Sequence, residues 1–271
     1  GIYVLDLSAN TVAVLSDAQG ILPWGTAIFE DSRHQVWLGQ PNGLVLMDSS
    51  LQIIQQFSEF AQGKESAVVK IREDAKQQVW IATKGNGIYK IDSARSLIQH
   101  FGPDQGHAGS EVNGFDLDNS GWPWIATSKG VTVIDDEHQH VYTLATGQGL
   151  ISSAANAAVY HNGTMAITTA KGLTTFAESK TTLNSTTGIE LTAQSFDRNQ
   201  GLAYTDFNAG SGTVLKDGGM AFGVDSKVMS IIGQTSVDTV SSPVYLTGIV
   251  LEGKTLVLTD NATQAAQLNA N

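Results

Sequence analysis

The sequence contains no cysteine, which excludes a disulfide framework, a cysteine-ligated zinc site and thiol catalysis. Basic residues are also few: 15 Lys and Arg stand against 26 Asp and Glu, and the formal net charge is −11. An acidic chain repels phosphate backbones, so we expect no nucleic-acid partner. Charged residues of both signs make up only 15% of the chain and there are only five prolines, which argues against a disordered polyampholyte.

Long apolar runs are missing as well. None approaches the ~18 residues that a membrane helix needs. The chain shows no signal peptide and begins with Gly1 rather than Met, so we expect it to be an excised piece of a longer protein. Its 271 residues exceed the usual 100 to 200 per domain, but closed all-β folds reach this length as one domain.

What the sequence does contain is an internal repeat. Trp37, Trp80 and Trp124 are spaced by 43 and 44 residues, and each follows an Asp by six residues. The same register continues to Ala166 and Ala221, where Ala replaces Trp. Two further markers recur in register: a Gly after the Trp, and a Gln-Gly pair before it. The Gly residues are Gly1, Gly43, Gly87, Gly130 and Gly172, and the pairs begin at Gln19, Gln62, Gln105, Gln148 and Gln200.

Each repeat reads as four short strands, as in "TAIFED", "QVWLG", "LVLMD" and "LQIIQQF". Four antiparallel strands in 40 to 45 residues is the period of a β-propeller blade. We therefore predict an all-β fold, a β-propeller of four-stranded blades. Residues 1–240 would hold five recognisable repeats plus the end of one more, about six blades' worth. Residues 241–271 would form an exit segment, either a linker or the start of a further small domain. In each blade the Trp would pack between neighbours, the Asp would bind backbone N–H groups of a turn, and the Gly would supply a position with φ above zero.

A propeller with an unpaired blade edge is prone to aggregate. Either the N-terminal strand completes the last blade, or the edges pair with something outside this chain. The total number of blades stays open at this point.

The unit "D-x-x-x-x-x-W-[IL]-[AG]-x-x-x-G-[LIV]" behind a Gln-Gly loop resembles the two-component regulator propeller repeat. The match is good in residues 25–57, 68–101 and 112–142 and weaker in 155–176, and residues 207–228 followed by "SPVYLTGIVLEGK" are similar to the last blade and exit of that family. The departures are Ala82 and Ala126 in place of a Gly, and the absence of Trp from the fourth and fifth units.

The resemblance implies the C-terminal part of a periplasmic propeller sensor. In such proteins an immunoglobulin-like domain, a membrane helix and a cytoplasmic histidine kinase or diguanylate cyclase follow the propeller. The resemblance thus implies a non-enzymatic ligand-sensing domain, tethered to the bacterial inner membrane through a missing C-terminal segment. A homodimer of the full-length protein is compatible with this plan.

Candidate ligand-binding residues follow from the connections between blades. The sequence diverges just after each Gln-Gly pair while the framework repeats, which suits a binding surface for a small molecule or an oligosaccharide on an axial face. The candidates are Trp24, Glu65, His107, Glu111, Asn113, Asn156, Tyr204, Asp206 and Asn208. We expect Trp24 and Tyr204 to lie on one face and to stack on a sugar ring. The alternative is that these loops vary only because they are loops.

Basic residues cluster in one stretch, where seven of the 15 fall within residues 64–95. Lys70 and Arg72 lie two apart on an expected inner strand and so share a face. One interpretation is a patch for an anionic ligand such as an acidic oligosaccharide. The other, which the register favours, is an ion pair of Arg72 with Asp116 in the next blade.

No catalytic or metal-binding pattern is evident, and we expect no cofactor. The six histidines have no metal-ligand spacing, although His138 and His140 could share a strand face. Two alternatives remain: a propeller lyase and a protein-binding scaffold. A lyase needs His, Glu or Tyr around a divalent metal, for which His107, Glu111 and Tyr204 are the candidates. A scaffold would show a large apolar patch and no pocket on the axial face.

Overall fold

The computed structural model describes residues 2–15, 21–41, 43–58, 67–102, 111–137, 140–177, 182–184, 188–216, 218–231, 248–251 and 254–257. The chain divides into two compact units, Gly1–Gly233 and Gln234–Asn271. Within the described ranges, no helix has the length and apolar character needed to cross a membrane. In the second unit, β24 (Gly248–Leu251) pairs with β25 (Lys254–Val257). The predicted boundary at residue 240 lies outside the described residues.

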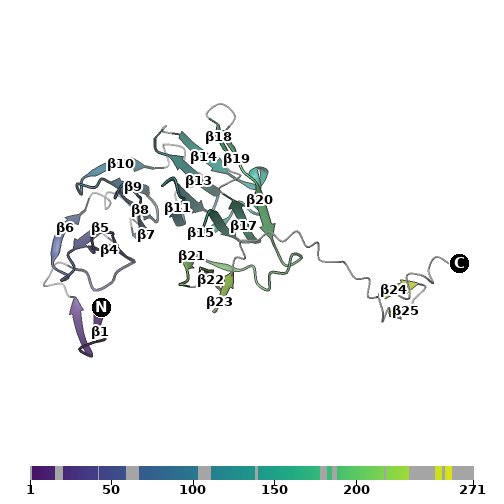
Figure 1. Cartoon of the computed structure of the whole chain (residues 1–271), viewed down its shortest axis with the longest axis horizontal. Coiled ribbons are helices and arrows are strands. Elements are labelled where there is room, and N and C mark those ends of the chain that lie inside the picture. Colours follow the sequence, from purple (N-terminus) through teal and green to yellow (C-terminus); the bar gives the residue numbers. More distant parts are fainter. Residues whose placement is uncertain are drawn as a thin grey trace. The chain divides into compact units, whose positions relative to one another are not determined.

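The first unit consists of antiparallel sheets that follow one another along the chain (Figure 1). Three of its sheets have four strands in simple sequential order. The first comprises β3 (Ala27–Glu30), β4 (Val36–Gln40), β5 (Gly43–Met47) and β6 (Ile53–Phe57). The second comprises β7 (Val68–Glu73), β8 (Val79–Thr83), β9 (Gly87–Ile91) and β10 (Leu97–Phe101). The third comprises β11 (Val112–Leu117), β12 (Pro123–Thr127), β13 (Gly130–Asp135) and β14 (His140–Leu144).

The next sheet has β15 (Ala155–His161), β16 (Thr164–Thr169), β17 (Gly172–Ala177) and β20 (Ala193–Phe196). A hairpin of β18 (Thr182–Asn184) and β19 (Gly188–Glu190) is inserted before β20. The last sheet has three strands, β21 (Phe207–Val214), β22 (Met220–Val224) and β23 (Lys227–Ile231). These sheets confirm the predicted fold class of propeller blades.

The chain opens with a two-stranded sheet, β1 (Ile2–Asp6) paired with β2 (Thr11–Leu15). Because β1 pairs with β2, and the described sheet of β21 holds only β21, β22 and β23, the N-terminal strand does not complete the last blade. Of the two alternatives for the blade edges, the structure therefore does not adopt the first.

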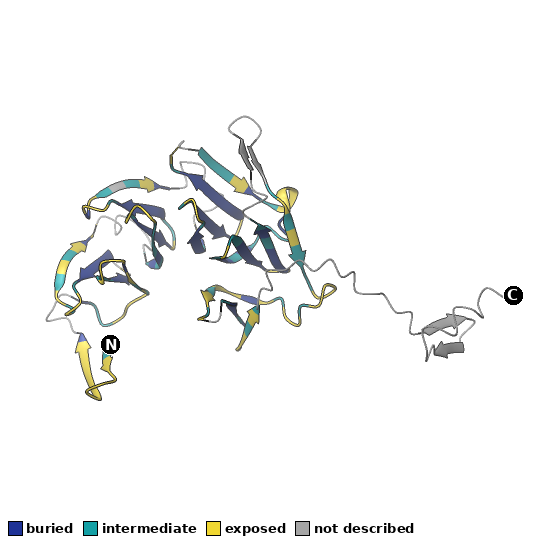
Figure 2. Cartoon of the chain, in the orientation of Figure 1, coloured by how far each residue is buried: buried dark blue, intermediate teal, exposed yellow. Residues whose placement is uncertain are grey.

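The first strands of consecutive sheets lie side by side, so β7 lies between β3 and β11, and β15 lies between β11 and β21. The middle strands β4, β5, β8, β9, β12 and β13 are buried almost throughout, whereas the outer strands β6 and β14 are only partly buried (Figure 2). We call β3, β7, β11, β15 and β21 the inner strands. They carry the side chains that converge on the axis of the blades.

The Asp of each repeat makes the predicted turn contacts and one more. In the second blade, one oxygen of Asp74 accepts hydrogen bonds from the backbone N–H groups of Lys76 and Gln78, at 2.9 Å each. The other oxygen accepts one from Nε1 of Trp80, at 3.0 Å. Asp31 and Asp118 make the same bonds, with Trp37 at 2.8 Å and Trp124 at 2.9 Å. The six-residue spacing from Asp to Trp therefore fixes the turn and the indole together.

The predictions for Trp and Gly are also confirmed. Trp37 packs in one cluster with β7, β8 and β9 side chains of the next blade, among them Ile71 and Ile81. Gly87 has φ +78°, and a Cβ there would lie 2.2 Å from the carbonyl oxygen of Phe101. Gly43, Gly130 and Gly172 have φ of +151°, +146° and +149°. A side chain at Gly87 would therefore clash with the neighbouring strand and strain the backbone.

Candidate functional site

The inner strands run from a loop end, where the described pairs Gln148-Gly149 and Gln200-Gly201 precede β15 and β21, to a turn end, where Asp31, Asp74 and Asp118 lie. Glu65 and His107 lie outside the described residues. The other seven predicted residues lie at the beginning of an inner strand or in the segment just before it. Trp24, Glu111, Tyr204, Asp206 and Asn208 are exposed, and Asn113 and Asn156 are half-buried. Whether any of them binds a ligand stays a prediction.

Two of the predicted residues, Asn113 and Asn156, form a repeated clasp between neighbouring blades. Nδ2 of Asn113 donates a hydrogen bond to the carbonyl oxygen of Ala155, at 2.8 Å, and Nδ2 of Asn156 donates one to that of Phe207, at 2.7 Å. Nδ2 of Asn208 bonds within its own blade, to the carbonyl oxygen of Asp225 at 2.9 Å. Asn113 is the extra residue of a β-bulge in the pairing of β11 with β12, and Asn156 is the extra residue of a β-bulge in the pairing of β15 with β16. The amide nitrogens of these residues thus hold the backbone together.

The Asn clasp has a sequence signal that interpretation of the loops alone misses. Asn113, Asn156 and Asn208 each follow the Gln of a Gln-Gly pair by eight residues. That regularity indicates a repeated structural contact rather than three separate ligand contacts. Each of these hydrogen bonds uses one of the two N–H donors of the amide, so the second N–H donor and the carboxamide oxygen are the groups that could bind a ligand.

Tyr204 lies beside a cation. Its hydroxyl oxygen accepts a hydrogen bond from Nζ of Lys227 at 2.7 Å, and the same ammonium lies 4.3 Å from the centre of the phenol ring. Lys227 begins β23, directly after the turn that follows β22, so this pair lies at the loop end. A ring with one side occupied by an ammonium retains its other side for stacking on a ligand.

Further along the inner strands, a charged cluster joins three blades. Nε of Arg72 on β7 donates a hydrogen bond to Oδ1 of Asp116 on β11 at 2.7 Å, which confirms the predicted ion pair. Nζ of Lys70 lies 3.8 Å from Oδ2 of Asp116 and 3.4 Å from the carbonyl oxygen of Ala158 on β15. A side chain from β7 that reaches β15, two blades away, crosses close to the axis. The cluster therefore brings two cations and one carboxylate together where the inner strands of three blades approach one another.

The electrostatics of this cluster are unbalanced. Burial first, and then the nearby charge of Arg72, lower the pKa of Lys70 from 10.5 to about 8, and the charge of Asp116 opposes this shift. Asp116 also accepts hydrogen bonds from the backbone N–H groups of Leu117 and Tyr160, at 3.2 Å each. Its oxygens are thus shared among several donors, while the ammonium of Lys70 has only one long hydrogen bond in the described part of the chain.

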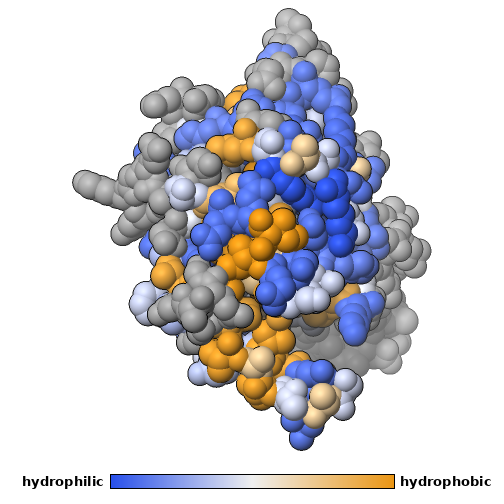
Figure 3. Space-filling model, turned by 90° about the vertical axis from the view of Figure 1, so that its left-hand side faces the viewer, coloured by the Kyte–Doolittle hydropathy of each residue, from blue (hydrophilic) through white to orange (hydrophobic). Residues whose placement is uncertain are grey.

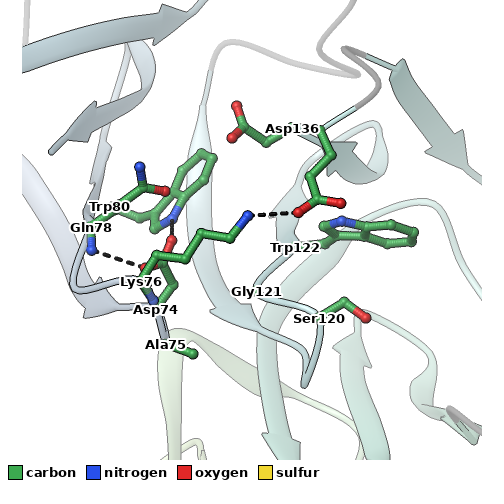
Figure 4. Close-up of a pocket in the computed structure, with 10 residues that line it drawn as sticks. Asp74, Ala75, Lys76, Gln78, Trp80, Ser120, Gly121, Trp122 and Asp136 are labelled. Atoms are coloured by element: carbon green, nitrogen blue, oxygen red, sulfur yellow. Dashed lines mark hydrogen bonds and ion pairs between the residues drawn. The ribbon is translucent and has the colours of Figure 1, made fainter.

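A recess of about 360 Å³, open to solvent, lies at the turn end between the blades of β7 and β11 (Figure 4). Lys76 reaches across it to Oε1 of Glu137 at 2.6 Å, and Lys90 pairs with Asp136 at its edge. Trp80 and Trp122 contribute aromatic surface. These two ion pairs link neighbouring blades, so the recess lies at a contact between blades. It contains none of the nine predicted residues.

An apolar surface lies on the opening sheet. Tyr3, Leu5, Val12 and Val14 are exposed by 66, 56, 61 and 55%, and they pair across β1 and β2 on one face. Figure 3 views the molecule from this side and shows apolar side chains gathered there. In the second four-stranded blade, Tyr89 and Ile91 occupy the places that Tyr3 and Leu5 have in the opening sheet. Both are buried against the preceding blade. This surface is therefore the face of a blade and not the axial face on which the scaffold alternative depends.

Within the described ranges, no group of three or more His, Asp or Glu side chains could hold a metal ion. His107, which the lyase alternative requires, is outside those ranges. Glu111 and Tyr204, the other two candidates, both lie at the loop end.

No family model matches the chain. No curated protein matches it either.

Solved structures do match, at low sequence identity. The extracellular domain assigned to a hybrid two-component system, BT3049, from B. thetaiotaomicron is 21% identical, with a TM-score of 0.62 over 74% of this chain and 26% of that one. The extracellular domain assigned to the system BT4673 from the same organism is 20% identical, with a TM-score of 0.58 over 86% and 33%. This chain thus spans about a quarter to a third of their length, and the likeness shows a shared fold.

A third match is an enzyme. Virginiamycin B lyase from Staphylococcus aureus is 13% identical, with a TM-score of 0.55 over 76% of this chain and 69% of the lyase. The sensor domains and the lyase thus share this fold, and the fold alone does not distinguish sensing from catalysis.

Proposed function

We propose that this chain is part of an extracytoplasmic ligand-sensing domain of a membrane-bound signalling protein in a bacterial periplasm. The ligand is a small hydrophilic molecule, with carbohydrate as the first candidate class. The observation that carries the proposal is the fold shared over 74 and 86% of the chain with extracellular domains of two sensory systems. The sequence resemblance to the propeller repeat of two-component regulators supports it independently.

The arrangement of the blades gives this proposal a physical basis. Each blade contributes one connection to the loop end, so residues distant in the sequence meet there. Trp24 and Tyr204 are exposed aromatic residues of this end, by 61 and 40%, and they can stack on the apolar face of a sugar ring. Glu111 and Asp206 are exposed carboxylates that can accept hydrogen bonds from hydroxyl groups.

A thermal-shift screen of the 271-residue chain against neutral and acidic saccharides, with and without divalent metal, tests the proposal. A ligand that binds only the folded state raises the melting temperature by mass action. We expect a metal-independent shift with no product formed, and loss of the shift for a neutral sugar in the Trp24→Ala/Tyr204→Ala variant. Absence of a shift with every saccharide would contradict a carbohydrate sensor, and a persistent shift in the variant would remove these two residues from the site.

The second candidate function is a lyase of the propeller type, favoured by the likeness to virginiamycin B lyase. Such an enzyme would show a shift that depends on divalent metal, together with consumption of the ligand. Chromatography of the incubated ligand separates the two functions, because a sensor returns it unchanged.

A further inference from the structure

The inner strands carry one position at which a single blade departs from all its neighbours. Lys70 pairs across to Ala82 on β8, and the positions with the same register in the other four-stranded sheets are Ala27, Gly114 and Ala157. All three are small. Small residues at this level allow the inner strands to approach closely: a Cβ added to Gly114 would lie 3.5 Å from the Cα atoms of Ala157 and Gly210.

Lys70 brings a cation into this narrow region without an adequate counter-ion. Its side chain is only 13% exposed, and Asp116, at 3.8 Å, is already bonded to Arg72. An ammonium offers three donors, and the described structure supplies one acceptor, the carbonyl oxygen of Ala158 at 3.4 Å. Burial of a cation with unfilled donors is unfavourable unless a partner completes its shell.

Arg72 has spare donors on the same side of β7. Nε serves Asp116, and Nη1 donates to the carbonyl oxygen of Ile71 at 3.1 Å. No acceptor in the described part of the chain bonds to Nη2. The Arg72 side chain is 30% exposed, so solvent and small solutes reach it. Lys70, Arg72 and Asp116 together carry a net charge of +1 when Lys70 is protonated.

We propose that Lys70 and Arg72 form a binding position for one singly charged oxyanion, such as the carboxylate of an acidic sugar. The inference rests on the proposed sensing function and specifies the charge of its ligand. The anion accepts hydrogen bonds from Nζ of Lys70 and Nη2 of Arg72, and it neutralises the excess charge of the cluster. The neighbouring small residues Gly114 and Ala157 confine the space, which favours a single planar acid group over a large polyanion.

Titration calorimetry of the full chain with galacturonate and with galactose tests the position directly, and the two sugars differ in their acid group. We expect galacturonate to bind at least 10-fold more tightly than galactose. Lys70→Met keeps the stem and removes the charge, and it should weaken galacturonate binding by about 10- to 100-fold, the usual effect of losing a hydrogen bond to a charged group. Lys84→Met, an exposed lysine on the same blade, is the matched control and should change nothing.

The pH dependence provides a second readout. The groups that face Lys70 are Arg72 on its own strand, Asp116 on β11 and the Ala158 carbonyl on β15. Wild-type affinity for galacturonate should fall as the pH rises from 7 to 10, because the ammonium is lost, and Lys70→Met should show no such fall.

Three other probes identify the source of the anion. Acetate binding alone would show that the acid group suffices without a sugar. Binding of a sulfated galactose would extend the site to sulfate esters, and tight binding of inorganic sulfate, a dianion at neutral pH, would contradict a site for a single charge. Equal affinity of Lys70→Met and wild type for galacturonate overturns the inference. If galactose binds as tightly as galacturonate, the inference fails while the sensing proposal stands, and if no saccharide binds, both fail.

Discussion

The ion pair of Arg95 with Asp31 allows a sharp test of how the blades are joined. Nη2 of Arg95 donates a hydrogen bond to Oδ2 of Asp31 at 2.5 Å, and the two side chains are 9 and 0% exposed. The guanidinium also lies 4.9 Å from the ring centre of Trp37. Because Arg95 belongs to the second four-stranded blade and Asp31 to the first, this contact ties the two blades together.

Asp31→Asn should destabilise the protein strongly. The amide keeps an acceptor for the turn but leaves the buried guanidinium without its counter-charge, which costs about 3–5 kcal/mol. Nε and Nη1 of Arg95 already lack a hydrogen-bond partner in the described structure, so the guanidinium has little to replace what it loses. At roughly 2–4 °C per kcal/mol for a domain of this size, the melting temperature should fall by about 6–20 °C.

Asp74→Asn is the matched control. Asp74 makes the same bonds to its turn and to its tryptophan, but it has no ion-pair partner in the described structure. Its substitution should lower the melting temperature by about one third as much, measured by circular dichroism at equal protein concentration. Arg95→Met removes the cation together with its unfilled donors, and combined with Asp31→Asn it should recover part of the loss. Equal losses for Asp31→Asn and Asp74→Asn would refute the idea that the buried pair matters beyond the turn.

Three further perturbations address the backbone, the axis and the clasp between blades. Gly87→Ala should lower the melting temperature by more than Gly201→Ala, because both have φ above zero but only the first meets a neighbouring carbonyl, at 2.2 Å; an equal effect would leave only backbone strain. Lys70 has a lower pKa in the folded than in the unfolded state, so the unfolded chain binds more protons between pH 8 and 10.5. The cost in folding free energy of burying the charged Lys70 is therefore complete below pH 8 and fades as the pH rises. Lys70→Met should be more stable than wild type by a few kcal/mol at most, and this gain should shrink from pH 7 to pH 10 in paired thermal melts. Asn156→Ala removes one hydrogen bond between blades and should lower the free energy of unfolding, measured with urea, by about 1 kcal/mol. An unchanged free energy of unfolding would mean that water replaces the side-chain amide.

The features that sequence predicts well in this chain are those that every blade shares. Trp80 meets the same kind of neighbour as Trp37, so a spacing of 43 residues is enough to recognise both. The ion pair of Arg72 with Asp116 was predictable for the same reason. A residue one period further along the chain lies in the adjacent blade at the same level, and the two inner strands are neighbours.

Contacts that depend on the distance between the inner strands of non-adjacent blades were not predictable in this way. Lys70 reaches Ala158, 88 residues along the chain and two blades away. Whether that gap can be spanned depends on how closely the inner strands approach, which rests on small residues such as Gly114 and not on the period of the repeat. The Asn113 and Asn156 clasps were visible as a regular spacing, but variable loops around them suggested a ligand role first.

In a repeat protein, side chains fall into two kinds according to their environment. A side chain that packs between blades meets the same environment in each repeat and therefore recurs, as the Asp and Trp of the turn do. A side chain that enters the axis meets the other blades once, so an unmatched residue there is not explained by the packing of its own blade. Lys70 fits the second description: the matching positions of three other blades hold Ala or Gly, and in the described structure Lys70 shares Asp116 with Arg72 and has one long hydrogen bond, to the carbonyl oxygen of Ala158. The asymmetry of the inner strands, rather than the variability of the loops, is thus the stronger support for the ligand position proposed at Lys70 and Arg72.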